Sequence, residues 1–432
     1  MKTIQIFFIL VASMLHASSS LIVYNSNIGL VHEEKKLTLK RNDTEIVYAG
    51  VANSIDIDSV NVQLPQGVKL YSQQYRYDKL TQQKLLEKQL GKKVFFQGAK
   101  VTLLSYFAKE ALVKTAKNRI ITIKTQDIAF ESIPKSLLTK PSLVWNIATS
   151  KSINASMQLD YIMKNISWSS NYILNLDGDT ADLTAWISIN NHTGKAFKET
   201  TLYVVAGDIN RVNTYQNRPQ IREMKAMMVD ASNVKEEAHE GYHLYTIPFQ
   251  VTLANNEKTE IKFLHKKALQ IQREYSVFLS NPLYLRGKQR SNVVQYLRLQ
   301  GIDSPLPQGI VRTYSKLHNT SILLGESKIA HTPKNEPIKL KIGRNFDVTV
   351  VQKELQRDDT KYRYRTTIQY TLKNASDTQK SVTLRIPFNT RADSIIETKE
   401  KYTFTQGNLV TFRVNIAPQS QKQFNVYYET KK

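Results

Sequence analysis

The chain of 432 residues contains no cysteine. This absence excludes disulfide frameworks, thiolate metal sites and cysteine nucleophiles together. Stability therefore has to come from hydrophobic packing and strand pairing. Hydrophobic residues make up 41% of the chain, which is enough for packed cores and argues against global disorder. A chain of this length is expected to form about two to four domains.

Short catalytic motifs are also missing from the sequence. It contains no G-x-S-x-G nucleophile elbow, no P-loop and no glycine-rich dinucleotide turn. Its eight histidines, which include His32, His192 and His239, are not paired in sequence with a nucleophile. We therefore assign no catalytic, cofactor-binding or metal-binding residue, expect no cofactor, and favour a non-enzymatic protein over an enzyme.

Two groups of residues have the side chains of metal ligands without the spacing of a metal motif. The first group is His331, Glu336 and Asp347. The second group is Asp177, Asp179 and Asp182. The first matches no zinc motif and lies beside turn residues, which favours a hydrogen-bonded turn. The second lacks the bidentate glutamate that a calcium loop places at a defined position.

Long apolar runs are absent from the body of the chain, where no stretch reaches the roughly 20 residues of a membrane-spanning helix. The N-terminus has the features of a secretory signal. Lys2 precedes the apolar segment 4–15, and small residues follow at 17–19. We expect residues 1–19 to be a cleaved signal peptide, no transmembrane segment in the mature chain, and a bacterial protein exported to the periplasm or the cell surface.

Acidic residues are few relative to basic ones. The chain has 60 Lys and Arg against 37 Asp and Glu, for a formal net charge of +23. In an exported protein this charge favours anionic lipid head groups, lipopolysaccharide phosphates or acidic glycans as partners, rather than nucleic acid. The alternative is that a diffuse positive charge only favours solubility.

One basic segment is the candidate contact for such an anionic partner. Its residues are Lys262, Lys266, Lys267, Arg273, Arg286, Lys288 and Arg290. Tyr275 and Phe278 lie within the segment, so aromatic faces would accompany the cations. The functional interpretation is an anionic contact patch, and the alternative is a solvated segment between domains.

The first third of the mature chain predicts a short helix followed by a small barrel. Leucines recur near helical spacing over residues 78–90, and Gly91 stands where a helix-terminating glycine is expected. Short β-prone runs follow at 94–96, 101–104, 111–113 and 120–123. A helix with four or five short strands is similar in shape to the SH3-like and Sm-like barrels.

The rest of the chain predicts antiparallel β-sandwiches. Polar and apolar residues alternate along several segments, 362–372 and 410–416 among them, which is typical of half-exposed strands. An internal repeat with a constant offset of 163 residues relates 249–263 to 412–426. Strands ending at Asn191 and Asn374 precede the two copies. Duplicated immunoglobulin-like sandwiches explain this pattern.

These patterns define the expected domain organisation. A β-rich N-terminal region with the helix and small barrel spans 20–140. The first sandwich spans 141–287 and carries a polar insert near 207–239, which is either a binding segment or, as we favour, a mobile loop or a helix lying across a sheet edge. The second sandwich spans 288–432.

Three segments carry a resemblance to a known family. They are Leu306–Tyr314 with its LPQGIVRTY run, His331–Glu336 with HTPKNE, and Gly343–Val348 with GRNFDV. In this order they resemble the bacterial family of unknown function that is related to the mucoidy-inhibitor A proteins. Asn335 replaces a glycine of that pattern, and the predicted small barrel, with a short helix before it, stands where many relatives have a long coiled coil. The resemblance implies a β-rich envelope protein without an assigned activity or catalytic residues.

The sequence therefore favours a scaffold that contacts an anionic envelope component, either an envelope protein, an anionic polymer or lipid head groups. Two alternatives stay open. The first is a polysaccharide hydrolase or modifying enzyme with a site assembled from distant residues, for which paired carboxylates would be required. The second is an adhesin or surface-layer component.

Overall fold

The computed structural model describes residues 19–134, 137–206, 235–239, 242–318, 320–388, 394–405 and 407–431. β-Strands dominate these residues, with one α-helix and two short 3-10 helices among them. The expected mainly β fold is therefore confirmed. Within these ranges, no helix has the length and apolar character needed to cross a membrane. The expected signal peptide lies outside the described residues except for Ser19.

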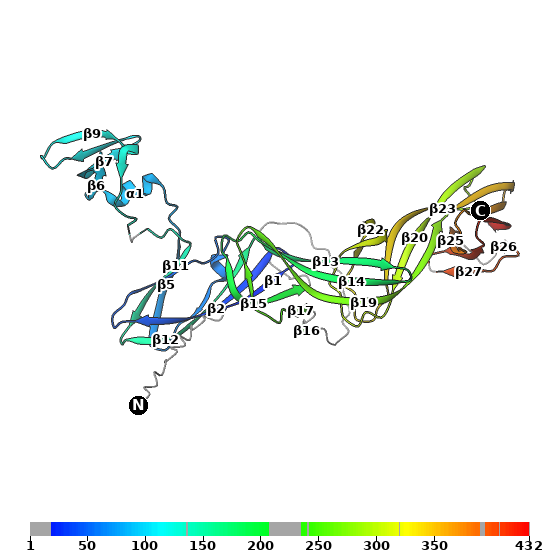
Figure 1. The fold of residues 1–432 in the computed structure, drawn as a ribbon, viewed down its shortest axis with the longest axis horizontal. Helices are drawn as coiled ribbons and strands as arrows, with labels where there is room; N and C mark the ends of the chain where they lie inside the picture. The colour runs from blue at the N-terminus through cyan, green and yellow to red at the C-terminus, as the bar shows by residue number, and fades with distance from the viewer. Residues whose placement is uncertain are drawn as a thin grey trace, which may run out of the picture. The chain divides into compact units, whose positions relative to one another are not determined.

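The chain folds into two compact units, whose elements are labelled in Figure 1. Unit 1 comprises Met1–Trp168, Ile189–Arg211 and Leu244–Thr259. Unit 2 comprises Ser169–Ser188, Val212–His243 and Glu260–Lys432. The strands β13 (Ile166–Asp177), β14 (Thr180–Asn191) and β19 (Glu257–Phe278) contribute residues to both. The domain boundaries expected after residues 140 and 287 stay predictions.

One eight-stranded sheet joins the start of the described chain to its middle. Its order is β16-β17-β15-β1-β2-β12-β4, with β18 paired to β15. The strands are β1 (Ser19–Tyr24), β2 (Ile28–Leu39), β4 (Asn61–Gln63), β12 (Ile153–Lys164), β15 (Phe197–Ala206), β16 (Lys235–His239), β17 (Tyr242–Thr246) and β18 (Val251–Leu253). β1 pairs in parallel with β15, Leu21 opposite Leu202. Both leucines are fully buried, so a strand at the N-terminal end of the described chain helps to complete a core formed much later in the sequence.

A three-stranded sheet lies beside the long strands of unit 1. It has the order β3 (Glu45–Ala49), β11 (Ser142–Thr149), β5 (Val68–Arg76), and η1 (Ile57–Ser59) precedes β4. Trp145 of β11 is fully buried, and its Nε1–H donates to the Oε1 atom of Gln73 at 2.8 Å. The indole therefore fills the core while its one polar atom keeps a partner.

A small module within unit 1 contains the only α-helix of the described chain. α1 (Gln82–Gln89) begins after Thr81, whose hydroxyl accepts from the Lys84 amide, and Gly91 follows with φ +73°. The helix predicted over 78–90 is thus confirmed in shorter form. Five strands follow: β6 (Lys93–Phe96), β7 (Ala99–Phe107), β8 (Glu110–Lys114), β9 (Ile120–Lys124) and, after η2 (Thr125–Asp127), β10 (Ile128–Ala129).

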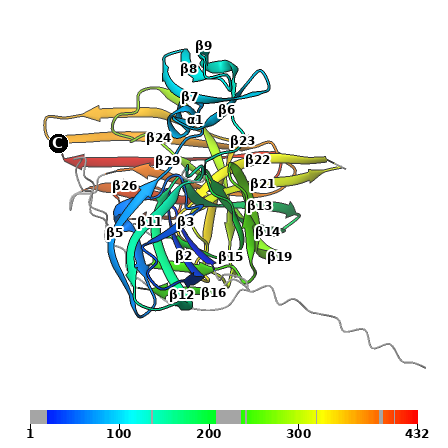
Figure 2. The same cartoon turned by 90° about the vertical axis from the view of Figure 1, so that its left-hand side faces the viewer.

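The module's strand order is β10-β6-β7-β8-β9, so the last strand returns to pair with the first. Its core contains Leu86 of α1 together with Leu103 and Val113, and Figure 2 shows α1 beside β6 and β7. The predicted helix and short strands are confirmed. The predicted barrel closure is wrong, because β9 and β10 stand at the two open ends of the described sheet. In the described sheet, β9 pairs with β8 and β10 pairs with β6, but β9 and β10 do not pair with each other.

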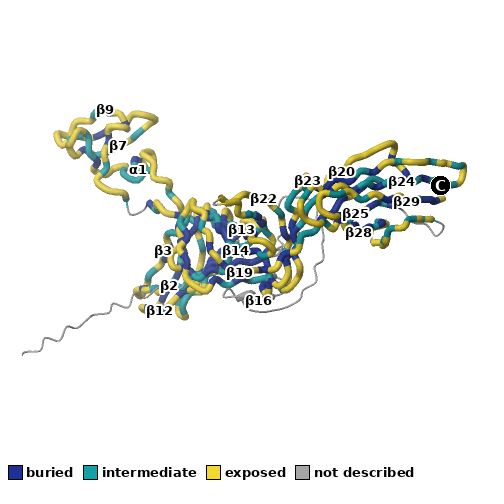
Figure 3. The backbone as a smooth tube through the Cα atoms, turned by 45° about the vertical axis from the view of Figure 1, so that its right-hand side comes forward, coloured by how far each residue is buried: buried dark blue, intermediate teal, exposed yellow. Residues whose placement is uncertain are grey.

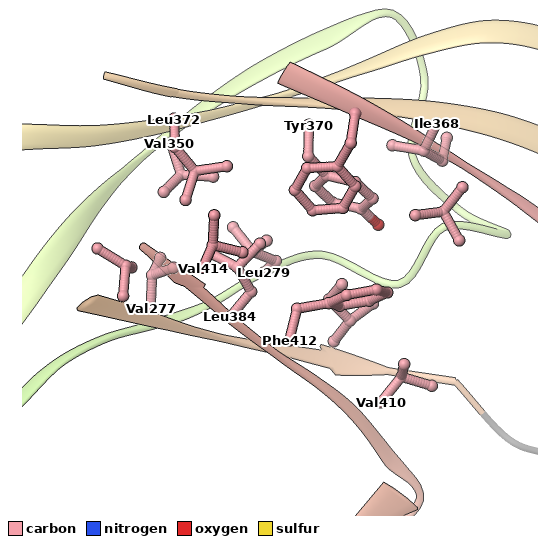
Figure 4. Packing of buried hydrophobic residues seen from close by; sticks show 14 of the residues in the cluster. Val277, Leu279, Val350, Ile368, Tyr370, Leu372, Leu384, Val410, Phe412 and Val414 are labelled. Atoms are coloured by element: carbon pink, nitrogen blue, oxygen red, sulfur yellow. The ribbon is translucent and has the colours of Figure 1, made fainter. Parts of the chain in front are cut away.

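Unit 2 contains a two-layered sandwich. Its strands are β20 (Lys288–Leu299), β21 (Gly309–Leu317), β22 (Thr320–Ile329), β23 (Ile338–Asp359), β24 (Arg363–Asn374), β25 (Lys380–Pro387), β26 (Ile395–Glu397), β27 (Tyr402–Thr405), β28 (Leu409–Ile416) and β29 (Ser420–Lys431). One layer runs β20-β23-β24-β29-β26, and the other β19-β25-β28-β27. Figure 4 shows Tyr370 from the first layer and Phe412 from the second between the sheets, with ring centroids 6.3 Å apart.

The predicted repeat is present in three dimensions as two matching hydrogen-bond networks. The Nδ2 atom of Asn191 donates to the carbonyl oxygens of Lys195, Leu253 and Ala254 at 2.9, 3.4 and 3.0 Å. The Nδ2 atom of Asn374 donates to Thr378, Ile416 and Ala417 at 2.9, 3.4 and 3.0 Å. In each copy the asparagine Oδ1 accepts from the hydroxyl two residues later, Thr193 or Ser376. A buried asparagine therefore joins a strand end to the terminal hairpin in both copies.

Two further sequence predictions have different outcomes. Asn335 adopts φ +63°, so asparagine does supply the positive φ expected in place of glycine. The polar insert near 207–239 falls outside the described residues, apart from the backbone of β16. Figure 3 shows how burial follows the strands of the described chain and how exposure follows its turns.

Candidate anion-binding concavity

A hollow lined by several basic side chains lies on unit 2. Six strands are hydrogen-bonded neighbours here, in the order β23-β20-β19-β25-β28-β27. Alternation along β25 buries Val382, Leu384 and Ile386 in the sandwich, which leaves Thr383 and Arg385 on the outer face. The hollow has a volume of about 1220 Å³.

Cationic side chains dominate the lining of this concavity. They are Arg273, Arg298, Lys339, Arg385, Lys401 and Arg413. Hydroxyl side chains lie between them, namely Ser381, Thr383, Thr403, Thr405 and Thr411. Glu274 is the single carboxylate among the described lining residues. The concavity therefore presents guanidinium, ammonium and hydroxyl donors to a ligand, which suits the oxygens of an anion.

Strand register brings two arginines together at the centre. Arg385 lies opposite Thr411, and Arg413 lies opposite Thr383, so the two guanidinium groups occupy diagonal positions on one face. Thr403 extends the row of Thr411 onto β27. Among the described residues neither arginine has an acidic partner, so both are available to an anion.

Glu274 holds two cations at one wall. Its carboxylate accepts from the Lys339 ammonium and lies 3.6 Å from the Arg298 guanidinium. Partial burial raises the pKa of Glu274, but the hydrogen bond and charge of Lys339 and the charge of Arg298 outweigh it and leave the pKa below its ordinary value. The Nε–H of Arg298 is buried and has no hydrogen-bond partner in the described part of the chain.

A smaller hollow of about 670 Å³ also lies on unit 2. Phe278 and Tyr284 line it with exposed fractions of 65% and 76%, together with Arg286 and Lys288. Phe278 lies opposite Arg385 in the parallel pairing of β19 and β25. Aromatic and cationic side chains therefore continue the polar face of the concavity.

The structure distributes the seven predicted contact residues over several places. Arg273 lines the concavity, where its guanidinium donates to the Asp179 carboxylate and the Gly178 carbonyl, both at 2.5 Å. Arg286 and Lys288 line the smaller hollow. Lys266 pairs with Asp303 at 2.6 Å, and that hydrogen bond lowers the pKa of the aspartate.

The other three predicted residues, Lys262, Lys267 and Arg290, are exposed and line neither hollow. The two aromatic residues of the segment also differ. Phe278 faces solvent as expected, but Tyr275 is 7% exposed and lies beneath the Lys380 ammonium, 5.0 Å from its ring centroid. Only part of the predicted basic segment therefore lines the concavity or the smaller hollow.

Sequence reasoning missed five of the six cations in the concavity: Arg298, Lys339, Arg385, Lys401 and Arg413. They lie on strands far apart in the sequence, and their grouping depends on pairing partners that no local pattern specifies. One signal was present, because Arg413 occupies the polar position between the buried residues Phe412 and Val414.

The two groups with metal-ligand side chains do not converge on a metal site. No group of three His, Asp or Glu residues within the described ranges is arranged to hold a metal ion. In the first group, the His331 Nδ1 atom accepts from the Gln308 amide, and the Glu336 amide donates to the Pro333 carbonyl. In the second, Asp179 pairs with Arg273, and Asp182 accepts from the Ala268 amide. Local hydrogen bonds and an ion pair thus engage the side chains of His331, Asp179 and Asp182.

A second polar cluster lies inside unit 1. The Lys195 ammonium donates to Glu33 at 2.5 Å and to the Tyr161 hydroxyl at 3.3 Å, and the Tyr48 hydroxyl also donates to Glu33. Burial, with the Glu33 charge added, raises the pKa of both tyrosines. The charges pair with each other, so the cluster has the character of a structural ion pair.

Comparison with models of known protein families gives no match, and comparison with curated proteins gives no significant match. The resemblance to the family related to the mucoidy-inhibitor A proteins therefore stays a prediction.

Proposed function

We propose that this protein is an exported envelope scaffold that binds an anionic polymer in the concavity of unit 2 without transforming it chemically. The observation that carries the proposal is the lining of the concavity, which has six cations against one carboxylate. The secretory features of residues 1–19 and the net charge of +23 are in keeping with a partner in the bacterial envelope.

The size and chemistry of the hollow favour a polymer over a small ligand. A volume of about 1220 Å³ exceeds that of most small-molecule sites, which are also lined mainly by apolar side chains. Here threonine hydroxyls alternate with arginines, so successive anionic groups of an extended chain meet successive donors. Glycoside hydrolysis by two carboxyl groups is not supported at this place, because Glu274 is the one carboxylate among the described lining residues.

Replacing Arg385 and Arg413 together by serine is expected to weaken binding of dextran sulfate about tenfold at low salt. Both guanidinium groups would contact sulfate oxygens, and serine keeps a polar outer face on β25 and β28. Isothermal titration calorimetry of the full chain measures the change. In cells that produce the chain, the same variant should leave the washed envelope at lower salt than the wild type, because exposed ion pairs are screened.

The matched control replaces Lys262 and Lys267 by serine, which removes the same charge from β19 outside the concavity. This control should bind dextran sulfate nearly as well as the wild type, and neutral dextran should bind neither protein. Equal losses in the two double variants would show that binding follows net charge alone, and the concavity would then not be the site.

Neutralising Glu274 is expected to strengthen binding. Because its pKa lies below the ordinary value of 4.5, the carboxylate stays ionised until the pH falls through that lowered pKa. Protonation then releases Lys339 and Arg298 to the ligand. We therefore expect affinity for dextran sulfate, whose sulfate esters stay ionised, to rise as the pH falls through the lowered pKa of Glu274. Glu274→Gln should show about threefold higher affinity at pH 7 and no such rise.

Glu326→Gln is the control for this titration, because Glu326 pairs with Arg312 at 2.8 Å and does not line the concavity. That variant should keep the wild-type affinity at pH 7 and the wild-type rise in acid. An acid rise of unchanged size in Glu274→Gln would assign the titration to another group.

A further inference from the structure

The outer face of the small module in unit 1 has no described element packed on it. Registers on β7, β8 and β9 place Phe107, Glu110 and Lys124 in one row, Ser105, Leu112 and Thr122 in the next, and Thr102, Lys114 and Ile120 in the third. The opposite face carries Leu103, Val113 and Ile123 into the module's core. Because side chains alternate between the two faces of a strand, the side chains of these three rows point away from the core and toward solvent.

Three large apolar side chains cross this outer face diagonally. Phe107 is 85% exposed, Ile120 62% and Leu112 41%. Leu104, which sits at the irregularity between Leu103 and Ser105, adds a further exposed side chain at 40%. A sheet face whose other side already forms a complete core gains nothing in stability from these residues, so their exposure indicates a contact surface.

Basic residues are frequent around the diagonal that Phe107, Leu112 and Ile120 form. Residues 82–129 contain ten Lys and Arg against three acidic residues. Lys114 and Lys124 lie on the outer face, and Lys109 lies in the turn that follows Phe107. None of these three has an acidic partner among the described residues. Glu110 is the one acidic side chain of the face, and it stands between Phe107 and Lys124 in register.

We propose that this face docks on the surface of an anionic phospholipid bilayer. Phe107, Leu112 and Ile120 enter the boundary between head groups and acyl chains, and Lys109, Lys114 and Lys124 contact phosphate oxygens. Phenylalanine and leucine side chains of interfacial segments are buried at that boundary, and each lysine near an anionic leaflet adds to the attraction. The surface lies on unit 1 and is separate from the concavity of unit 2, so it adds a lipid contact to the proposed polymer contact.

A bilayer fits both kinds of side chain on this face. A soluble polyanion would neutralise the lysines but leave Phe107 and Ile120 in water. A neutral apolar partner would cover those two and desolvate the lysines without compensation. An anionic bilayer surface supplies a charged layer and an apolar layer side by side, in the geometry that the diagonal and its flanking lysines require.

Vesicle co-sedimentation of the full chain tests the proposal. With vesicles of equal parts phosphatidylglycerol and phosphatidylcholine, Phe107→Ser with Ile120→Ser is expected to weaken binding at least about tenfold, and Lys114→Glu with Lys124→Glu to a similar extent. Vesicles of phosphatidylcholine alone should bind all proteins weakly. In Phe107→Trp, brominated acyl chains should quench the new indole, which reports its insertion directly.

Matched controls lie on unit 2. Phe404→Ser removes a residue that is 54% exposed, Lys353→Glu with Lys373→Glu reverses two exposed charges, and Arg385→Ser with Arg413→Ser removes the proposed polymer contact. All three should keep wild-type vesicle binding. The proposal is overturned if the Phe107 and Ile120 variant binds normally, if the indole at 107 is not quenched, or if dextran sulfate at equal charge completely displaces the variant Arg385→Ser with Arg413→Ser from vesicles. The last result would assign the face to a soluble polyanion.

Discussion

Asn374→Ala is expected to lower the free energy of unfolding of unit 2 by about 3 kcal/mol. Asn374 is fully buried, and its Nδ2 atom is a hydrogen-bond donor to the carbonyls of Thr378, Ile416 and Ala417. Alanine removes the shared donor of these carbonyls and the acceptor of the Ser376 amide, and only the hydroxyls of Ser376 and Ser420 still donate, to Thr378 and Ala417. Hydrogen–deuterium exchange followed by mass spectrometry measures the loss in peptides of β24, β25 and β28.

The duplicated network supplies a matched experiment. Asn191→Ala removes the same bonds in unit 1 and should accelerate exchange in β15 and β18 while leaving β25 and β28 protected. Asn415→Ala is the surface control, because Asn415 is exposed on β28, and its effect should stay within about 0.5 kcal/mol. If Asn374→Ala were as mild as Asn415→Ala, the network would not be a stabilising feature of either copy.

Phe412→Ala is expected to cost unit 2 about 3–5 kcal/mol, because it removes a fully buried ring and leaves a cavity. The Phe412 ring lies 5.5 Å from Phe424 and 5.8 Å from Tyr402, centroid to centroid. It is thus at the centre of the aromatic packing between the two layers in Figure 4. Differential scanning calorimetry should show the transition of unit 2 lowered by roughly 10 °C.

Phe404→Ala is the control for this cavity. Phe404 stands on the neighbouring strand β27 and is 54% exposed, so its removal should cost less than about 1 kcal/mol. A transition of unit 2 that is lowered equally by both substitutions would contradict the placement of Phe412 in the core. A transition lowered in unit 1 would contradict the division of the chain into two units.

Local patterns in the sequence were sufficient for the secondary structure. Residues 410–416 alternate between buried Val410, Phe412 and Val414 and their polar neighbours, and the alternation follows from the two-residue period of a strand. The helix near residue 85 was likewise readable from leucine spacing and from Gly91. The 163-residue repeat predicted a duplicated strand and hairpin, and the paired asparagine networks confirm it.

Local sequence patterns did not predict the candidate concavity. Arg273 was singled out because it lies in a basic segment, whereas Arg385 and Arg413 lie among apolar and threonine residues with no cluster to mark them. They meet because β25 pairs with β28, and they join the wall of β19 through a parallel pairing at Tyr275–Phe278. Parallel partners are necessarily distant in sequence, so local spacing contains no information about them.

By itself, the sequence determined the β class of the protein, its short helix, its duplicated hairpins and its excess of positive charge, because each follows from composition, from a period of two to four residues or from the 163-residue repeat. Only the tertiary structure decided which cations share a surface, that Tyr275 is buried while Phe278 is exposed, and that Phe107, Leu112 and Ile120 lie on one diagonal. Those outcomes depend on strand register, and register is set by the packing of whole sheets rather than by neighbouring residues.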